Sequence, residues 1–133
     1  MRAFETVRLR ADPAATAPDG TAVRLLLALA GGSFAHFELP AGAVSHAVAH
    51  KTVEEIWYFL SGRGEIWRKG GAEESVVEVG PGVSLTIPLG TAFQFRAHAE
   101  APLAFLAVTM PPWPGAQEAD LVAGRWAATV AHS

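Results

Sequence analysis

Two histidines and a glutamate, His46, His50 and Glu55, lie in one short stretch of the chain, and His36 precedes them. Imidazole and carboxylate groups are ligands for divalent transition metals, and they are also common general acids and bases. In an extended strand, His46 and His50 would project from the same face, because residues two apart point the same way. One hypothesis is therefore a metal centre built on His50, Glu55 and His46, with His36 as a further candidate ligand.

The same residues also allow a metal-free interpretation. His50 and Glu55 could form a hydrogen-bonded pair in the protein interior, because a buried imidazole or carboxyl group is tolerated when it has a partner. Glu55 would then act as a catalytic base and His50 as its partner. The residues alone leave both interpretations open.

Four aromatic residues are candidates for binding a ligand. Trp57 and Phe59 share strand parity with Glu55, and Phe93 and Phe95 share parity with each other. If Glu55 faces inward, Trp57 and Phe59 face inward as well. An aromatic-lined cavity with a few polar groups is typical of small-molecule sites. The alternative is that these four rings only pack the core.

Short apolar runs separated by glycine and proline predict an all-β protein of one domain. The chain has 133 residues with 13 glycines and 9 prolines, and it contains no cysteine. One helical turn within Gln117–Val122 is the only helix we expect, and Val23–Ala30 should be buried on both faces. The expected strands are Thr6–Arg10, Val23–Ala30, Ser33–Leu39, Val44–His50, Glu55–Leu60, Glu65–Arg68, Ser75–Val79, Val83–Pro88, Ala92–Ala97 and Leu103–Thr109.

The region after the last strand is rich in proline. Residues Met110–Gly115 should be stiff and extended, because proline restricts its own backbone and that of the preceding residue. This tail could place Trp113 across the mouth of a barrel or against another subunit. His98 is expected in a loop, and His132 in a disordered end of the chain.

The first of two glycine patterns resembles a motif of the cupin family. That motif runs Gly-x5-His-x-His-x(3–4)-Glu-x6-Gly. In this chain Gly42, His50, Glu55 and Gly62 match it, while Val48 stands at the position of the first histidine.

The second pattern resembles the other cupin motif, Gly-x5-Pro-x-Gly-x2-His-x3-Asn. Gly82, Pro88 and Gly90 match, whereas Phe93 takes the histidine position and Ala97 the asparagine position. The resemblance implies a double-stranded β-helix, or jelly-roll barrel, as a single cupin domain over residues 1–133. Its barrel core would span about residues 21–110, with an N-terminal strand before it and an extended tail after it.

Members of this family with a full site bind a divalent ion of Mn, Fe, Ni, Cu or Zn through three imidazoles and a carboxylate. Here two of those four positions are filled, by His50 and Glu55, and neither Val48 nor Phe93 can donate a lone pair. Two protein ligands seldom hold a catalytic metal. The resemblance therefore implies at most one divalent metal ion, weakly held.

Composition excludes several classes of partner. The net charge is −3 and no cluster of Lys or Arg is present, so we expect no nucleic-acid partner. No apolar run is long enough to span a bilayer, so we expect no membrane partner and a cytoplasmic location. Ile56, Tyr58 and Leu60 share the other face of their strand and would form an apolar patch, which predicts a homodimer.

Three functions remain open from the sequence. The first is a metal-dependent enzyme of the oxygenase, isomerase or cyclase type, acting on a small organic substrate in the barrel. The second is a metal-free enzyme or binding protein that uses His50, Glu55 and the aromatic cavity. The third is a structural or sensing module without chemistry. The fold alone does not choose among them.

Overall fold

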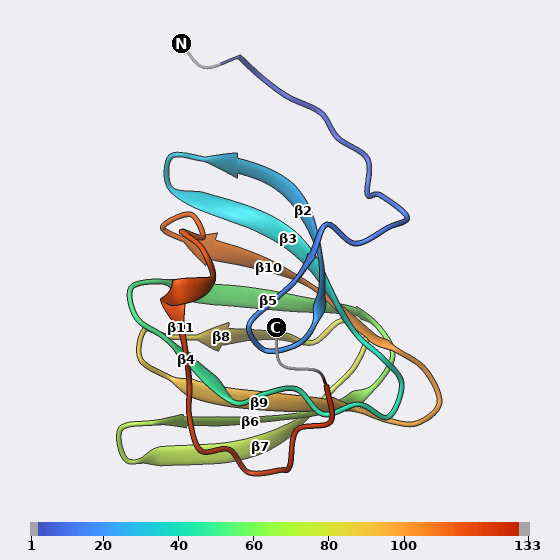
Figure 1. Cartoon of the computed structure of the whole chain (residues 1–133), viewed down its shortest axis with the longest axis vertical. Helices are drawn as coiled ribbons and strands as arrows, with labels where there is room; N and C mark the ends of the chain where they lie inside the picture. The colour runs from blue at the N-terminus through green and yellow to red at the C-terminus, as the bar shows by residue number, and fades with distance from the viewer. Residues whose placement is uncertain (1–2, 131–133) are drawn as a thin grey trace.

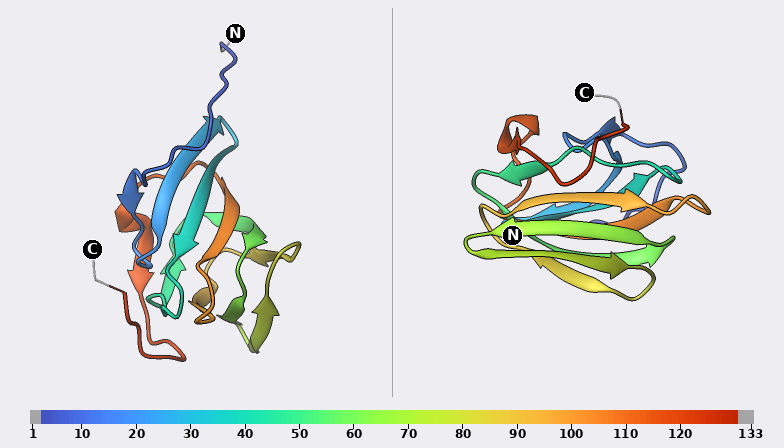
Figure 2. Two further views of the ribbon diagram at one scale, coloured as in Figure 1. Left: turned by 90° about the vertical axis from the view of Figure 1, so that its right-hand side faces the viewer. Right: turned by 90° about the horizontal axis from the view of Figure 1, so that it is seen from below.

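Two antiparallel sheets form the computed structural model, which describes residues 3–130 (Figure 1). The larger sheet has the strand order β1-β2-β3-β10-β5-β8, and the smaller has the order β11-β4-β9-β6-β7. In the left view of Figure 2, β2 in blue, β3 in teal and β10 in orange lie side by side. The elements are β1 (Ala15–Thr16), β2 (Ala22–Leu29), β3 (Gly32–Leu39), β4 (Val48–His50), β5 (Glu54–Ser61), β6 (Gly64–Gly70), β7 (Glu73–Val79), β8 (Ser84–Ile87), β9 (Ala92–Ala97), β10 (Leu103–Met110), the 3-10 helix η1 (Ala116–Glu118) and β11 (Ala119–Leu121).

This architecture confirms the expected all-β jelly roll. Strand β5 shows how the sequence specifies it, because its buried and exposed residues alternate along the strand. Glu55, Trp57 and Phe59 point into the space between the sheets, whereas Ile56 and Tyr58 are on the outer face. The alternation fixes the register, since a slip by one residue would expose the aromatic side chains.

The core between the sheets is dominated by aromatic rings. Trp57 of β5 stacks on Phe105 of β10 with ring centroids 4.1 Å apart, and it meets the edges of Phe93 and Phe95 from β9. The rings therefore join the two sheets across their shared interior. Such offset-stacked and edge-to-face pairs contribute free energy beyond the burial of their surface.

Gly62 is required where the chain turns from β5 into β6. Its φ is +76°, and a Cβ atom there would lie 2.0 Å from the carbonyl oxygen of Pro102. Only glycine fits both the positive φ and the close approach of another backbone segment. The last glycine of the first motif therefore has a backbone role at this corner.

Three strand predictions were wrong in part. The segment Thr6–Arg10 forms no strand, and β1 lies instead within the stretch expected to be a loop. Strand β2 is not buried on both faces, since Leu25 and Leu29 are exposed. The predicted strand Val44–His50 is regular only over β4, and Val44 contributes a single bridge to Arg96.

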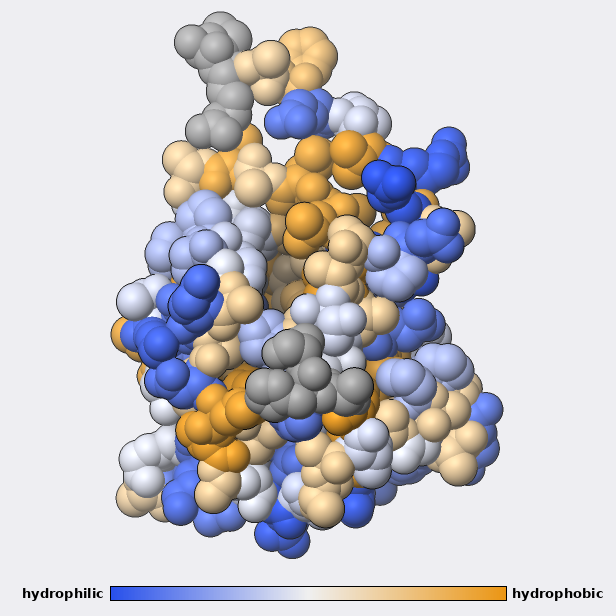
Figure 3. Space-filling view, viewed as in Figure 1, coloured by the Kyte–Doolittle hydropathy of each residue, from blue (hydrophilic) through white to orange (hydrophobic). Residues whose placement is uncertain are grey.

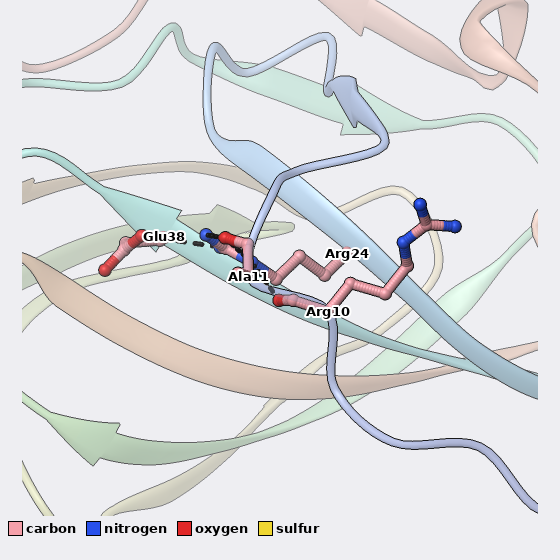
Figure 4. A network of polar contacts seen from close by, with 4 residues as sticks. All are labelled: Arg10, Ala11, Arg24 and Glu38. Atoms are coloured by element: carbon pink, nitrogen blue, oxygen red, sulfur yellow. Dashed lines mark hydrogen bonds and ion pairs between the residues drawn. The ribbon is translucent and has the colours of Figure 1, made fainter.

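A polar network anchors the segment that precedes β1 (Figure 4). The Arg24 guanidinium donates hydrogen bonds to the backbone carbonyls of Arg10 and Ala11, at 2.9 and 2.7 Å. It also forms an ion pair with Glu38 of β3 at 3.4 Å. The network fixes residues 10 and 11 beside β2, and the following residues fold back over one end of the barrel.

The C-terminal segment is extended up to Gly115, as predicted, and then packs onto the smaller sheet. The expected helical turn forms as η1, which begins one residue before the predicted range, and residues 119–121 of that range instead form β11, which pairs with β4. His98 lies in a loop, as expected, whereas His132 lies outside the described residues. Among residues 3–130 no helix is long and apolar enough to cross a membrane.

Candidate functional site

The corner between β4 and β5 brings His50 and Glu55 to one interior space. Strand β4 belongs to the smaller sheet and β5 to the larger, so residues 51–53 carry the chain from one sheet to the other. His50 is 8% exposed and Glu55 is 5% exposed. Both side chains line the same cavity.

The cavity has a volume of about 460 Å³. Residues 15–19 form one part of its wall, and the C-terminal segment forms another through Trp113, Ala116 and Ala119. On the face shown in Figure 3, hydrophobic residues surround a hollow in the upper half of the molecule. Its aromatic lining consists of Phe34, Phe37, Trp57, Phe93, Phe105 and Trp113, and its titratable lining consists of Asp19, His50 and Glu55.

Glu55 is held rigidly at the wall of this cavity. The indole N–H of Trp57 donates to Oε1 at 2.9 Å, and the hydroxyl of Thr109 donates to Oε2 at 2.5 Å. Burial raises the pKa of Glu55 above its usual value, and these two hydrogen bonds oppose part of that rise. The carboxyl group is therefore easier to protonate than one in water.

His50 sits between two aromatic rings. Phe93 and Trp113 approach the imidazole edge-on, with centroids 5.2 and 5.3 Å away. The Nδ1 atom is buried and has no hydrogen-bond partner among the described residues. Burial lowers the pKa of His50, while the nearby Asp19 and Glu118 carboxyl groups oppose this. The net effect favours the neutral form of the imidazole over the charged form.

The hydrogen bond expected between His50 and Glu55 is not formed. Glu55 accepts from Trp57 and Thr109, and Nδ1 of His50 has no hydrogen-bond partner within the described part of the chain. The alternation of side chains along a strand predicts that both side chains face the interior. It does not predict the distance between them across the β4–β5 corner.

Asp19 is the second buried carboxyl group that lines the cavity, and it is a site residue that the motifs did not predict. Its Oδ1 accepts from the backbone N–H of Thr21 at 3.0 Å and from the Thr21 hydroxyl at 2.6 Å. Burial raises the pKa of Asp19, and the two hydrogen bonds from Thr21 oppose part of that rise. An Asp-Gly turn is normally exposed, so only the tertiary structure shows that this one folds inward.

The four predicted aromatic residues divide into two pairs. Trp57 and Phe93 line the cavity, as the ligand-binding hypothesis requires. Phe59 and Phe95 lie deeper, are fully buried and belong to the hydrophobic core. The core-packing alternative therefore describes Phe59 and Phe95.

Comparison with known proteins agrees with the architecture. The family model described as "Cupin domain" matches residues 35–109, which is more than half of the chain. The chain belongs to the cupin family. No curated protein sequence matches it.

Three solved structures illustrate the similarity of this cupin to others. A cupin protein from Bacteroides fragilis is 29% identical, with a TM-score of 0.64 and coverage of 84% of this chain and 86% of that one. A conserved protein with a double-stranded β-helix domain from Klebsiella pneumoniae is 16% identical, with a TM-score of 0.65 and coverage of 93% and 99%. A variant of PAC13 from Streptomyces, solved with uridine, is 12% identical, with a TM-score of 0.63 and coverage of 79% and 80%. Because their sequence identities are low, the Klebsiella pneumoniae and Streptomyces structures show only that the fold is shared.

Two of the four candidate metal ligands are misplaced in this cupin. His36 pairs with Leu106 and Arg24 on the outer face of the larger sheet, away from Glu55. His46 precedes the regular part of β4, so it does not share the face of Val48 and His50 and does not line the cavity. The expectation for His46 relied on strand alternation, but residues 45–47 do not form a strand.

The residues present do not fit a metal ion. Within residues 3–130 no group of three His, Cys, Asp or Glu side chains could hold one. Val48 and Phe93 are directly paired across β4 and β9, and both are almost completely buried. The positions where the family motif has two histidines are thus filled by apolar side chains. Cupins often bind a metal, but this donor set is too small for one.

Glu118 fastens the C-terminal segment over the cavity. Its carboxylate accepts from the backbone N–H and hydroxyl of Thr52 and from the N–H of Val53 at the β4–β5 corner. Burial raises the pKa of Glu118, but these hydrogen bonds outweigh that effect and hold it below the usual range. The same contacts fix the segment that carries Trp113 and the corner that separates His50 from Glu55.

We expect Glu118→Ala to lower the free energy of unfolding at pH 7 by about 2–3 kcal/mol, because it removes a charged acceptor from three donors of Thr52 and Val53, and the N–H of Val53 is buried. The stabilisation by Glu118 is present above its unfolded-state pKa and is lost as the pH falls through its lower folded-state pKa. Denaturation in urea at pH 7 and at acidic pH measures both effects. Asp120→Asn is the matched control, since Asp120 forms only an exposed ion pair with Lys51, and it should cost less than about 1 kcal/mol. Equal losses in the two variants would contradict this role.

Proposed function

We propose that this cupin binds a small, predominantly apolar organic molecule in its barrel cavity without a metal ion. The observation that carries the proposal is the cavity itself, which has a volume of about 460 Å³. Its walls are mostly apolar and include several aromatic rings, with Asp19, His50 and Glu55 as isolated titratable groups. Small-molecule sites have this composition, with an apolar lining that supplies affinity and a few polar groups that orient the ligand.

The titratable groups support proton transfer to or from such a ligand. Burial raises the pKa of Glu55 and of Asp19 and lowers that of His50. A carboxyl group that retains its proton can donate it, and a neutral imidazole can accept one. The proposed function therefore includes general acid–base chemistry by Glu55 and His50. The PAC13 structure solved with uridine gives an example of this fold studied with a small organic molecule.

Fluorescence of N-phenyl-1-naphthylamine, which is uncharged at neutral pH and emits strongly in apolar surroundings, tests the binding proposal. We expect saturable binding to the unmodified protein. Ala35→Trp should weaken binding by about tenfold or more, because Ala35 lines the cavity and an indole there would fill it. Tyr58→Ser is the matched control, since it removes an aromatic ring from the outer face. Equal binding by the unmodified protein and Ala35→Trp would contradict the proposal.

We further propose that the protein forms a homodimer through the outer face of β5. Ile56, Tyr58 and Leu60 are 44, 48 and 40% exposed there, so the predicted patch lies at the surface. Covering such a patch removes apolar area from water. Sedimentation at micromolar concentration should give a dimer, and Tyr58→Glu should shift it to monomer. A monomer at all concentrations would contradict the dimer.

A further inference from the structure

We propose that the ligand of the cavity is an organic cation, specifically an amine attached to an aromatic or aliphatic body. This inference rests on the proposed binding function and adds the charge class of the ligand. It follows from three features of the lining: two buried carboxyl groups, a buried imidazole nitrogen without a partner in the described residues, and several aromatic rings.

The first feature is the sign of the charges available in the cavity. Asp19 and Glu55 contribute carboxyl groups, and no Lys or Arg is among the described residues that line the space. An anionic ligand would lose its hydration and gain no opposite charge in return, which is costly. For a cationic ligand, the carboxyl groups of Asp19 and Glu55 could ionise and act as counter-ions.

The geometry of Asp19 and Glu55 leaves room for that contact. Thr21 donates both of its hydrogen bonds to Oδ1 of Asp19, which leaves Oδ2 to accept from a ligand. Each oxygen of Glu55 accepts one hydrogen bond and retains a further lone pair. An ammonium group has three N–H donors and can use these free acceptor positions.

His50 is the independent sign that the cavity takes a polar ligand. It is more than nine-tenths buried, lines the cavity and has an unpartnered Nδ1. Buried polar atoms of native proteins normally have a partner. Burial lowers the pKa of His50, and the Asp19 and Glu118 carboxyl groups oppose part of that lowering.

The walls suit a cation with an apolar body. Trp57, Phe93, Phe105 and Trp113 present aromatic rings to the cavity. A cation over the face of such a ring is attracted by the ring electrons, and more strongly when water is excluded. The remaining aliphatic surface would bury the rest of the ligand.

Binding of a cation should release protons. Asp19, His50 and Glu55 are the titratable groups that line the cavity within the described chain, and burial raises the pKa of both carboxyls. A bound ammonium lowers these pKa values again by favouring the charged carboxylates. The dissociation constant should therefore decrease as the pH rises through the folded-state pKa values, while the amine stays protonated.

Isothermal titration calorimetry with three probes of similar body tests the proposal: 2-phenylethylamine, 2-phenylethanol and 3-phenylpropionate. We expect the amine to bind about tenfold more tightly than the alcohol at pH 8, and the carboxylate to bind more weakly than either. Titrations repeated at a series of lower pH values, in buffers of different ionisation enthalpy, should show proton release with the amine only, because a carboxyl group must be protonated before binding to release a proton. Equal or tighter binding of the alcohol or carboxylate overturns the charge class and leaves the binding function standing. No binding of any probe overturns both.

Two variants test whether Asp19 and Glu55 cause the preference for the amine. Asp19→Asn and Glu55→Gln keep the hydrogen-bond acceptors and remove the charge, so each should weaken amine binding and reduce proton release without changing the affinity for the alcohol. Glu54→Gln is the matched control, because Glu54 is the exposed neighbour on the other face of β5. Unchanged amine binding in both variants overturns the proposal. If either variant fails to fold, the comparison of the three probes in the unmodified protein decides.

Discussion

Replacing Val48 and Phe93 together by histidine should give this barrel a metal site that the natural chain lacks. The two residues are paired across β4 and β9 and are buried beside His50. With Glu55, the double variant would have three imidazoles and one carboxylate, which is a complete set for a divalent transition metal. We expect one equivalent of metal to survive gel filtration, with at least about a thousandfold gain in affinity.

Metal content by mass spectrometry, with Zn²⁺ or Ni²⁺ supplied, checks this gain. The single variants Val48→His and Phe93→His should lie between the unmodified protein and the double variant. Adding His50→Ala to the double variant should remove most of the gain. An unmodified protein that already retains a full equivalent of metal would show that the ligands lie elsewhere.

Trp57→Ala should cause the largest loss of stability among simple truncations near the cavity, about 3–5 kcal/mol in the free energy of unfolding. Trp57 is 2% exposed, stacks on Phe105 and contacts Phe93 and Phe95. Its removal leaves a large void where the two sheets meet. It also removes the indole donor to Glu55, which raises the cost of burying that carboxyl group when it is charged.

Chemical denaturation followed by circular dichroism measures the loss. Tyr58→Ala is the matched control, because it removes an aromatic ring from the next residue of the same strand on the outer face. Trp57→Phe separates the two contributions, since it keeps much of the packing but not the hydrogen bond, and it should cost about 1–2 kcal/mol. A cost for Trp57→Ala no greater than that for Tyr58→Ala would refute the account of the core.

The sequence was sufficient to place Glu55 and Trp57 because strand alternation is a local property. Once β5 forms, alternate residues must face the interior, and the apolar pattern decides which set does so. The glycines at the corners were predictable for a similar reason, since Gly62 adopts a backbone geometry that other residues disfavour. These features depend on a few neighbouring residues.

The rest of the site depends on contacts between distant segments. Asp19 enters the cavity because β1 pairs with β2 and its carboxyl group bonds to Thr21. His46 leaves the face of His50 because the strand begins only at Val48. Glu118 reaches the corner after β4 from a segment far along the chain. No periodicity in the sequence encodes these positions.

Binding of N-phenyl-1-naphthylamine before and after dialysis against a chelator tests the central claim, a metal-free ligand site, most directly. Metal content should be well below one equivalent in the protein purified without chelator. We predict the same dissociation constant and the same thermal stability after dialysis, and no change when Zn²⁺, Fe²⁺, Mn²⁺, Ni²⁺ or Cu²⁺ is added. Loss of binding on dialysis, with recovery on adding one of these ions, would contradict the account.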